Sequence, residues 1–558
     1  MTPRSLPVLD LVPPGAPAGG PRDPFLPEDV RLAEFRPEIR SLPSFFVWTL
    51  GCQMNRSDSE EMAGRLFAAG CPEAPSMDAA DLVVINTCAI REAAEAKVIG
   101  RQGHLGRLKA ANPGMRVVMT GCSVRESNRA GLVRRYPAVD LFLRPDEEPE
   151  LVDRLGIASA QAPVGAMAMA MTAATTLVKG MAVSDASHLV RARADAVAGG
   201  AVSRGSAISA WLPIIYGCDK TCTYCIVPFS RGPERSRPFD EVVDEARALA
   251  AAGYREVTLL GQNVNSYGHD LAAEARFGHV VTVRTVGRHQ DREARPDLAE
   301  LIRAVDGLRA AEGDGRPAIP RLRFVTSHPW DLSDRLIEAM RDCASVCESL
   351  HLPVQSGSDS MLRRMGRQYT IDHYRERLAR IREAVPGIAL STDVIVGFCG
   401  ETEGEYEETL RLLEAIRYDQ VFAAAFSQRP GTPATRLSDD VPAAEKRRRL
   451  VGLLAIQEGI GLERNRAWLG RTAEVLVDTI VPPRTHDHVG EPGEDGEAGG
   501  SSTSRDAFAR LPEGVSHLLG RSRESKLVHV AGSPDLLGRE VRVTIGHAGP
   551  YALRGTLA

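Results

Sequence analysis

The sequence lacks two things: a long run of strongly apolar residues and a large excess of basic charge. Its least polar long stretch, "APVGAMAMAMTAATTLV" from Ala162, is rich in Ala and Thr rather than Leu and Ile. It falls short of the roughly 20 strongly apolar residues that span a bilayer. The net charge is −5, so contact with nucleic acid must come from local basic patches and not from a field over the whole protein. We therefore expect no membrane span.

An export signal is also missing from the N-terminal stretch. "MTPRSLPVLDLVPPGAPAGGPRDP" is rich in Pro and Gly and has no apolar segment of signal-peptide length. We expect residues 1–41 to be a disordered tail and the protein to be cytoplasmic. The cytosol keeps thiols reduced, so the ten cysteines are not expected to form a disulfide framework. Clustered cysteines in such a protein are more often metal ligands or catalytic groups.

The chain does have the length and composition for several globular domains. A chain of 558 residues is too long for a single ordinary hydrophobic core. Its 43% apolar and 25% charged residues are normal for a globular protein. Residues 42–157 contain three apolar runs, each followed by a helical pattern, and "VDLFL" supplies a fourth run. This alternation predicts a parallel α/β sheet. The three runs end at Cys52, Cys88 and Cys122, which we expect to converge at one edge of the sheet.

Residues 158–206 are rich in Ala, Gly and Met and are expected to form a flexible linker or insertion. Residues 207–468 then alternate six strand patterns with helical patterns, which predicts a β/α barrel, partial or full, with its active site at the carboxyl ends of the strands. The segment 273–297 interrupts this period and is expected to be a surface insertion. Residues 469–558 have short β patterns with Gly turns, typical of a small β-barrel. Within it, about 482–515 are low in apolar residues and predict a disordered loop.

Cys218, Cys222 and Cys225 follow the first barrel strand at the spacing C-x3-C-x2-C. Three thiolates so close together repel one another and need a cation or a cluster. Zinc would need a fourth ligand, but the closest downstream histidine, His269, is distant in sequence. A [4Fe–4S] cluster takes one ligand per iron, so three cysteines leave one iron open for a small molecule.

Cys52, Cys88 and Cys122 also form a set of three without an evident fourth ligand. Three buried cysteines packing as small apolar groups are the alternative. Equivalent positions at three strand ends, two of them after Gly, favour a second cluster with an open iron. The other four cysteines are expected to be inert thiols: Cys71, Cys343, Cys347 and Cys399.

The cysteine motif after the first barrel strand resembles the radical S-adenosylmethionine superfamily, in which the open iron is chelated by the amino and carboxylate groups of S-adenosylmethionine. With the second trio, the chain resembles the methylthiotransferases. These have an N-terminal domain with a second cluster, a radical barrel and a C-terminal TRAM domain that grips the substrate. "TLGCQMNRSDSEEM", "NTCAIREAAEAKV", "GCDKTCTYCIVPFSRGPERSRP", "LLGQNVNSYG" and "HLPVQSGSDSMLRRMGRQYT" are similar to the MiaB type. The resemblance covers about 42–150 and 206–558, and the family usually has Pro where Cys399 stands.

The resemblance implies a tRNA methylthiotransferase that converts N6-dimethylallyladenosine at position 37, 3′ of the anticodon, to its 2-methylthio derivative. It implies two [4Fe–4S] clusters, one on Cys218, Cys222 and Cys225 that cleaves S-adenosylmethionine to a 5′-deoxyadenosyl radical. The auxiliary cluster, on the first trio, would deliver sulfur, and a second S-adenosylmethionine would supply the methyl group. Replacing an unactivated aromatic C–H bond needs such a cofactor, because no side-chain acid or base can do it at neutral pH.

Polar residues at strand ends are candidates for holding S-adenosylmethionine or substrate, with ordinary loop contacts as the alternative. These candidates are Gln262, Asn263, Asn265, Gln355, Ser356 and Asp393. A basic run after the cluster loop either pairs with phosphate or with the cofactor carboxylate, or is a solvated face: Arg231, Arg235 and Arg237. In the C-terminal segment, Arg521, Arg523 and Lys526 are expected to hold the RNA backbone while the adenosine is splayed into the barrel.

The expected partners are the anticodon stem-loop of tRNA, an electron donor such as flavodoxin or ferredoxin, and a sulfur donor, with no membrane and a monomeric enzyme. Two relatives compete within the family: one acts on threonylcarbamoyl-adenosine in tRNA, and the other on a ribosomal-protein aspartate. "GQNVNSYG" and "GCQMN" favour the dimethylallyl-adenosine enzyme. Outside the family, the alternative is a non-catalytic iron–sulfur or zinc protein that binds RNA.

Overall fold

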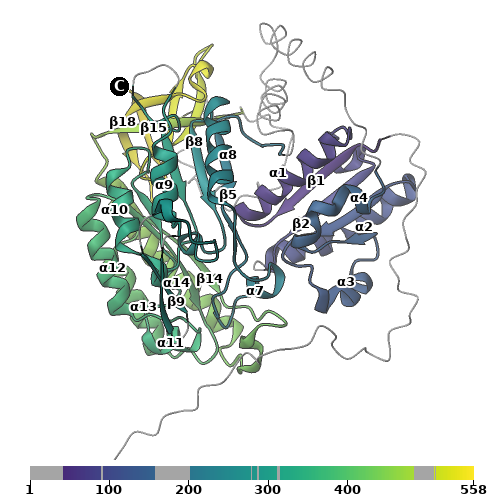
Figure 1. Ribbon diagram of the computed structural model, residues 1–558, viewed down its shortest axis with the longest axis horizontal. Helices are drawn as coiled ribbons and strands as arrows, with labels where there is room; N and C mark the ends of the chain where they lie inside the picture. The colour runs from purple at the N-terminus through teal and green to yellow at the C-terminus, as the bar shows by residue number, and fades with distance from the viewer. Residues whose placement is uncertain are drawn as a thin grey trace, which may run out of the picture.

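The N-terminal sheet lies beside a larger β/α unit, which also carries a small β-barrel, in the computed structural model of Figure 1. The structure describes residues 42–89, 92–157, 202–277, 280–285, 288–293, 295–310, 315–482, 508 and 511–558. The predicted tail over 1–41, most of the predicted linker (158–201) and most of the predicted loop (483–507) lie outside the described residues. No helix among the described residues is both long enough and apolar enough to cross a bilayer.

The N-terminal unit is a four-stranded parallel sheet in the order β1-β2-β3-β4, which confirms the predicted α/β sheet. Every residue of the interior strand β2 is buried, because one hydrophobic cluster contains Val83 and Ile85 and another contains Leu82 and Val84. Burial on both faces is typical of parallel strands. The elements are β1 (Phe45–Leu50), α1 (Gln53–Ala68), β2 (Leu82–Thr87), α2 (Glu92–Ala111), β3 (Arg116–Thr120), α3 (Arg129–Arg135), β4 (Leu141–Phe142) and α4 (Leu151–Arg154).

The central unit is an open half-barrel of parallel strands. Its two sheets, β5-β8-β11 and β12-β13-β14, are joined by a parallel bridge between Leu322 and Val346. Among the described strands, β5 and β14 do not pair with each other, so the barrel is partial rather than full. Its strands are β5 (Ser209–Pro213), β8 (Glu256–Leu260), β11 (Arg321–Phe324), β12 (Ser349–His351), β13 (Ala389–Val396) and β14 (Gln420–Ala425).

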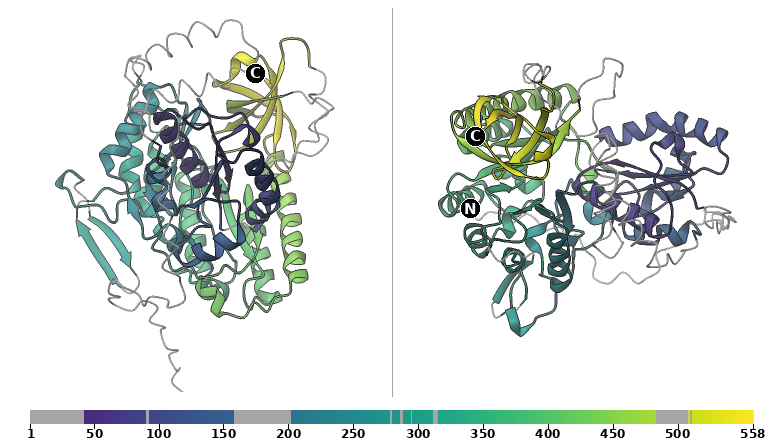
Figure 2. Two further views of the ribbon diagram at one scale, coloured as in Figure 1. Left: turned by 90° about the vertical axis from the view of Figure 1, so that its right-hand side faces the viewer. Right: turned by 90° about the horizontal axis from the view of Figure 1, so that it is seen from above.

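Helices pack against these strands and share one continuous hydrophobic core with them. They are α8 (Phe239–Ala251), α9 (Leu298–Asp306), α10 (Asp334–Asp342), α12 (Ile371–Ala384), α13 (Glu403–Ile416), α14 (Ala443–Arg466) and the short α11 (Asp359–Arg364). The short α7 (Val227–Ser230) follows Cys225 and lies outside this core. A short antiparallel pair, β6 (Ile215–Tyr216) and β7 (Arg235–Ser236), flanks the cysteine loop. The predicted insertion contains the hairpin β9 (Val280–Thr285) and β10 (Arg288–Glu293), which projects from the half-barrel in Figure 2.

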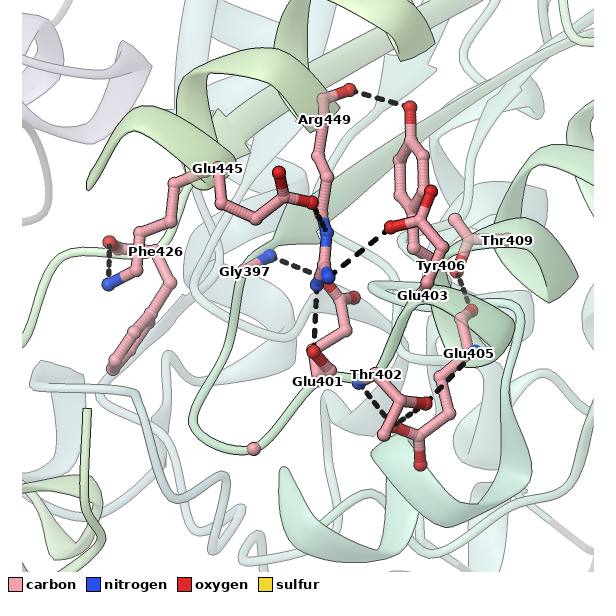
Figure 3. A network of polar contacts seen from close by, with 12 residues as sticks. Gly397, Glu401, Thr402, Glu403, Glu405, Tyr406, Thr409, Phe426, Glu445 and Arg449 are labelled. Atoms are coloured by element: carbon pink, nitrogen blue, oxygen red, sulfur yellow. Dashed lines mark hydrogen bonds and ion pairs between the residues drawn. The ribbon is translucent and has the colours of Figure 1, made fainter. Parts of the chain in front are cut away.

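A buried ion pair fastens α14 to the start of α13, as Figure 3 shows. The Arg449 guanidinium donates to a carboxylate oxygen of Glu401 at 2.9 Å and to one of Glu445 at 2.8 Å. Tyr406 donates its hydroxyl proton to the main-chain oxygen of Arg449 at 2.9 Å. Since the Arg449 side chain is only 6% exposed, the pair works as part of the packing between the two helices.

The C-terminal unit is a closed five-stranded barrel in the order β15-β16-β17-β19-β18, as the sequence predicts. It docks at the amino ends of the half-barrel strands. Arg321, the first residue of β11, is fully buried and donates to Glu540 Oε1 at 2.7 Å. Lys526 Nζ lies 2.6 Å from an oxygen of Asp419, just before β14. The barrel strands are β15 (Thr472–Val481), β16 (Ser516–Ser522), β17 (Leu527–Gly532), β18 (Glu540–Ala548) and β19 (Leu553–Leu557).

Candidate functional site

A cleft of about 2740 Å³ runs from the N-terminal sheet through the interior of the half-barrel to the C-terminal barrel. All six cysteines of the two predicted sets line it: Cys52, Cys88, Cys122, Cys218, Cys222 and Cys225. The carboxyl ends of the N-terminal strands and of the half-barrel strands therefore face one shared space. This is the edge where parallel sheets bind ligands.

Cys52, Cys88 and Cys122 meet because the ends of β1, β2 and β3 are in register. Leu50 lies opposite Thr87, and Asn86 lies opposite Thr120. Gly121 has φ +91°, and a Cβ there would lie 2.2 Å from the main-chain oxygen of Thr87. The glycine before Cys122 is therefore required for the strand ends to approach so closely.

Two buried asparagines fix the loops that carry Cys52 and Cys88. The Cys52 thiol donates to Asn55 Oδ1 at 3.3 Å, and Asn55 Nδ2 donates to Asn86 Oδ1 at 2.7 Å. Asn86 Nδ2 donates in turn to the main-chain oxygen of Asn55 at 2.8 Å. Sequence reasoning did not identify these residues, although both stand inside the quoted motifs "GCQMN" and "NTC". Their amides hold the two cysteine loops in one arrangement.

The second set, Cys218, Cys222 and Cys225, lies on the loop between β6 and α7. The loop begins at Gly217, with φ +77°, where a Cβ would lie 2.0 Å from the main-chain oxygen of Pro233. The Cys225 amide donates to the main-chain oxygen of Cys222 at 3.0 Å, which forms a tight turn between two of the thiols. The chain is thus folded so that three thiols gather at one end of the half-barrel.

Burial favours the protonated form of cysteine thiols in both sets. Only a strongly positive group can therefore displace their protons and bind them. Burial and the neighbouring thiols raise the pKa of Cys225 to about 12, and burial with the nearby Glu234 carboxylate raises the pKa of Cys218. Burial likewise raises the pKa of Cys122. Without metal, all three are therefore neutral thiols at pH 7, and metal binding must displace their protons.

The spacing of the cysteine sulfurs fits a cluster better than a single zinc ion. Four sulfurs around tetrahedral zinc lie about 3.8 Å apart, given a Zn–S bond of about 2.3 Å. Among the described residues, no three cysteine sulfurs lie within 4.8 Å of one another. A [4Fe–4S] cluster takes one thiolate per iron and so spreads its ligands more widely. The spacing therefore counts against a single zinc ion at either set.

The loop that carries the second cysteine set reaches the first set. Ile226, the residue after Cys225, packs against Ala89 and Cys122 in a small hydrophobic cluster. Arg231, from the same loop, donates its Nε proton to Cys122 Sγ at 3.1 Å. The loop that carries one set therefore touches the other set directly.

Comparisons with known proteins agree with this arrangement. The family model of the radical SAM superfamily matches residues 212–413. The model of an uncharacterized protein family, UPF0004, matches residues 44–144. The tRNA-2-methylthio-N(6)-dimethylallyladenosine synthase of Acetivibrio thermocellus is 36% identical over 95% of this chain and 94% of its own length. The synthase of the same name from Carboxydothermus hydrogenoformans is 37% identical over 92% of this chain and 99% of its own.

The chain belongs to the tRNA-2-methylthio-N(6)-dimethylallyladenosine synthase family. This confirms the resemblance predicted from the motifs. Among solved structures, the radical S-adenosylmethionine methyltransferase TsrM from Kitasatospora setae matches with a TM-score of 0.45 and 14% identity, over 81% of this chain and 79% of its own. A radical SAM domain implies a [4Fe–4S] cluster and S-adenosylmethionine, so the half-barrel has a cofactor to hold.

Four of the six polar residues predicted to hold the cofactor in this synthase-family chain line the cleft: Gln262, Asn263, Gln355 and Asp393. Gln262 accepts a hydrogen bond from the Gly217 amide through Oε1 at 2.6 Å, while its buried Nε2 has no partner among the described residues. The same part of the chain offers no partner to the buried Asn263 Oδ1. Since buried polar atoms are nearly always hydrogen-bonded, both atoms fit a site that a polar ligand completes.

The other two candidates, Asn265 and Ser356, are absent from the cleft lining that the structure describes. Asn265 Nδ2 donates to the main-chain oxygen of His328, and Asn265 Oδ1 accepts from the His328 amide, each at 2.8 Å. Ser356 is fully buried, and its hydroxyl lies 3.3 Å from that of Thr409. These hydrogen bonds indicate a structural role for both residues, because their side-chain polar atoms already have partners within the protein.

Sequence reasoning missed two residues beside the second cysteine set. Arg367 is buried and donates to Cys222 Sγ at 3.4 Å and to the main-chain oxygen of Pro353 at 2.9 Å. His328 is buried in the cleft wall, and burial with the charges of Arg367 and Lys220 holds its pKa well below the usual range. The signal for Arg367 was its place in the quoted motif "MGRQYT".

Backbone strain also gathers at the cleft. Thr326 and Gln355 both line it and both have φ +70°. A left-handed conformation is costly for residues other than Gly, and for a β-branched residue it is a genuine outlier. These two positions follow β11 and β12, where the half-barrel opens into the cleft. The strained positions therefore lie in the cleft wall.

The basic residues predicted to contact phosphate or RNA mostly have carboxylate partners. In the run after the cluster loop, Arg231 pairs with Asp58 at 2.5 Å and Arg237 with Glu245 at 2.8 Å. Arg235 is exposed.

In the C-terminal barrel, Arg523 pairs with Glu348 at 2.8 Å, and Lys526 pairs with Asp419. Both therefore neutralise charge between the half-barrel and the C-terminal barrel. Arg521 lines the cleft. RNA binding by Arg521, Arg523 and Lys526 stays a prediction.

The four remaining cysteines are buried and do not line the described cleft: Cys71, Cys343, Cys347 and Cys399. Burial raises the pKa of Cys343 and of Cys347 to about 11, so both are thiols at neutral pH. These properties agree with inert thiols.

Glu61 on α1 makes the contact between the two units sensitive to pH. Tyr216 donates to Glu61 Oε1 at 3.3 Å, and burial followed by the Asp58 carboxylate raises the Glu61 pKa from about 4.5 to about 7. The folded protein therefore holds more protons than the unfolded chain between these pH values. Its stability falls as the pH rises through this window and stays lower above it.

We expect Glu61→Gln to remove this penalty. The variant should gain at most about 3.5 kcal/mol at pH 8.5, since one pKa unit corresponds to about 1.4 kcal/mol, and less than about 1 kcal/mol at pH 5. Thermal unfolding at pH 5 and pH 8.5 measures the difference. Glu126→Gln is the control, because Glu126 is 72% exposed. An equal melting-temperature gain at both pH values would contradict the prediction.

Proposed function

We propose that this enzyme converts N6-dimethylallyladenosine at position 37 of tRNA, 3′ of the anticodon, to its 2-methylthio derivative. It would use S-adenosylmethionine and two [4Fe–4S] clusters. One observation carries the proposal: both cysteine sets face the same cleft, and Ile226 and Arg231 from the loop of one set contact Cys122 of the other. Two groups that act in turn on one carbon atom must both reach it, and a shared cleft allows this. Identity of 36% and 37% to the two synthases over nearly the full chain supports the substrate.

Each cysteine set has a separate part. Cys218, Cys222 and Cys225 would hold the cluster that binds S-adenosylmethionine, and Cys52, Cys88 and Cys122 the auxiliary cluster. When bound, these groups supply the one-electron and sulfur chemistry that side chains cannot supply at neutral pH. The unpartnered atoms Gln262 Nε2 and Asn263 Oδ1 would bind polar groups of S-adenosylmethionine in the cleft.

Residues next to the second cysteine set keep its surroundings fixed. Arg367 donates to Cys222 Sγ, and its guanidinium keeps a permanent positive charge beside this set. His328 accepts the Trp330 amide proton at Nδ1 at 3.2 Å, so its own proton lies on Nε2. The neutral imidazole can donate one hydrogen bond into the cleft without adding charge there.

The C-terminal barrel would act as the TRAM domain that holds the tRNA. The cleft reaches this barrel at Arg521 and Lys526, and the half-barrel is open between β5 and β14, where an adenosine taken out of the anticodon loop would enter. An electron donor such as flavodoxin or ferredoxin and a sulfur donor would be the further partners. The enzyme would act as a cytoplasmic monomer.

The decisive experiment is an assay of the anaerobically reconstituted protein. We expect about eight irons per chain, four for each cluster. With a reductant, sulfide and S-adenosylmethionine, tRNA that carries unthiolated dimethylallyladenosine should gain the 2-methylthio group, detected by nucleoside analysis. A Cys222→Ala variant is the control and should hold about four irons and form no product.

Each other outcome rejects part of the proposal. Thiolation of threonylcarbamoyl-adenosine or of a ribosomal-protein aspartate, with dimethylallyladenosine untouched, would assign the other substrate. About four irons or fewer would reject the two clusters. A protein that binds tRNA but leaves S-adenosylmethionine intact would be a non-catalytic RNA-binding protein.

A further inference from the structure

Arg231 crosses from the half-barrel into the N-terminal unit. It belongs to the loop that carries Cys218, Cys222 and Cys225, yet its guanidinium contacts the other cysteine set. Its Nε–H donates to Cys122 Sγ at 3.1 Å, and its Nη2 donates to Asp58 Oδ2 at 2.5 Å. The side chains of Arg231 and Asp58 are each 5% exposed.

The charge on Arg231 is permanent and is enclosed by acceptors. A guanidinium does not lose its proton in proteins, so the buried cation must be neutralised by neighbouring groups. Asp58 comes from α1 and is the main neutralising partner; Glu148 also lies close enough to attract Arg231 when ionised, although burial raises its own pKa. Glu148 is itself held by the Thr120 hydroxyl, which donates to it at 2.7 Å. Thr120 ends β3, two residues before Cys122, so the network surrounds one cysteine of the set.

The planar guanidinium suits this position better than an ammonium group would. Its Nε–H and Nη2–H point in fixed directions, and one side chain can therefore hold a sulfur and a carboxylate together. Hydrogen bonds to cluster sulfurs draw off negative charge and help to set the reduction potential of the cluster. Partners that hold metal ligands in place also raise the affinity for the metal.

We propose that Arg231 is a positioning residue for the auxiliary cluster: it holds Cys122 and fastens the N-terminal unit to the loop of the other cysteine set. The inference rests on the proposed function, because it assumes that Cys52, Cys88 and Cys122 bind a cluster. It adds a physical link between the two clusters. The same side chain fixes the distance between the sets and tunes one of them.

The test isolates the auxiliary cluster by replacing Cys218, Cys222 and Cys225 with Ala. In this background, Arg231→Met keeps the length and apolar stem of the side chain and removes its donors. We expect iron to leave for a chelator about 10- to 100-fold faster, as is typical when a partner of a metal ligand is lost. The midpoint potential of the remaining cluster, from a redox titration followed by electron paramagnetic resonance, should become more negative.

Arg449→Met in the same background is the matched control. Arg449 is as buried as Arg231 and is also held by carboxylates, but it lies between α13 and α14 (Figure 3). We expect it to destabilise the fold while leaving iron release and the potential unchanged. Arg231→Lys keeps the charge beside Asp58 and lets the test proceed if Arg231→Met does not fold. It should give shifts of the same sign that are smaller.

The inference would be overturned if both Arg231 variants released iron at the rate of the parent protein and kept its midpoint potential. It would also be overturned if Arg449→Met changed the iron release and the potential as much as Arg231→Met does. Either result leaves the proposed function intact, provided that the parent protein without Cys218, Cys222 and Cys225 holds about four irons. A parent protein without iron would reject the auxiliary cluster, and with it both the inference and the proposed function.

Discussion

Cys88→Ala is expected to abolish methylthiolation of tRNA while the protein still cleaves S-adenosylmethionine. Cys88 follows β2, is fully buried and faces the cleft between the other two cysteines of its set. Losing one of three protein ligands should cost more than losing a partner of a ligand, which typically lowers activity 10- to 100-fold. We therefore expect product formation to fall by more than about 100-fold. The set proposed to bind S-adenosylmethionine stays complete, so cofactor cleavage should continue.

Two measurements separate these steps: nucleoside analysis counts the 2-methylthio product, and chromatography counts the 5′-deoxyadenosine from S-adenosylmethionine. Cys71→Ala is the matched control, because Cys71 is a buried thiol of the same N-terminal unit that packs in its hydrophobic core. It should keep both activities. Product formation by Cys88→Ala at a tenth of the wild-type rate or more would remove the auxiliary role from this cysteine. Loss of cofactor cleavage would show that the two sets do not act separately.

The strand-end cysteines were predictable because local chemistry determines their position. An apolar run followed by Gly-Cys marks the point where a parallel strand leaves the core, and the structure has Gly121 there in a conformation that other residues rarely adopt. The C-x3-C-x2-C spacing is equally local. Such signals need no knowledge of how the units dock.

Contacts between units could not be predicted in this way. Arg231 looked like part of a basic run, yet it meets Cys122 across a sequence separation of 109 residues. Arg523 and Lys526 were expected to contact RNA, which stays a prediction, but their pairs with Glu348 and Asp419 of the half-barrel could not be foreseen. A basic residue on a strand is the same in sequence whether its partner is a phosphate or a carboxylate of another unit. Only the docked structure shows which acceptor lies within reach.

The docking of the C-terminal barrel depends on one buried guanidinium. Arg321 donates to Glu540 Oε1 at 2.7 Å, to the main-chain oxygen of Arg521 at 2.7 Å and to that of Glu474 at 3.1 Å. Its side chain has no exposed surface. Arg321→Met would leave a carboxylate and two carbonyl oxygens without this donor in a buried interface. Breaking a buried pair by removing one partner typically costs ~3–5 kcal/mol.

We therefore expect Arg321→Met to lower the free energy of opening of the C-terminal barrel by ~3–5 kcal/mol, measured by hydrogen exchange of its amides. Hydrogen exchange suits a chain of several units, because each unit can open separately. Arg255→Met is the control, because it removes a solvent-exposed partner of the same carboxylate. Arg255 lies 3.5 Å from Glu540, and its side chain is 42% exposed. Exposed pairs contribute about 1 kcal/mol or less. Similar losses in both variants, or a loss below about 1 kcal/mol in Arg321→Met, would mean that apolar packing holds the barrel in place and that Arg321 does not.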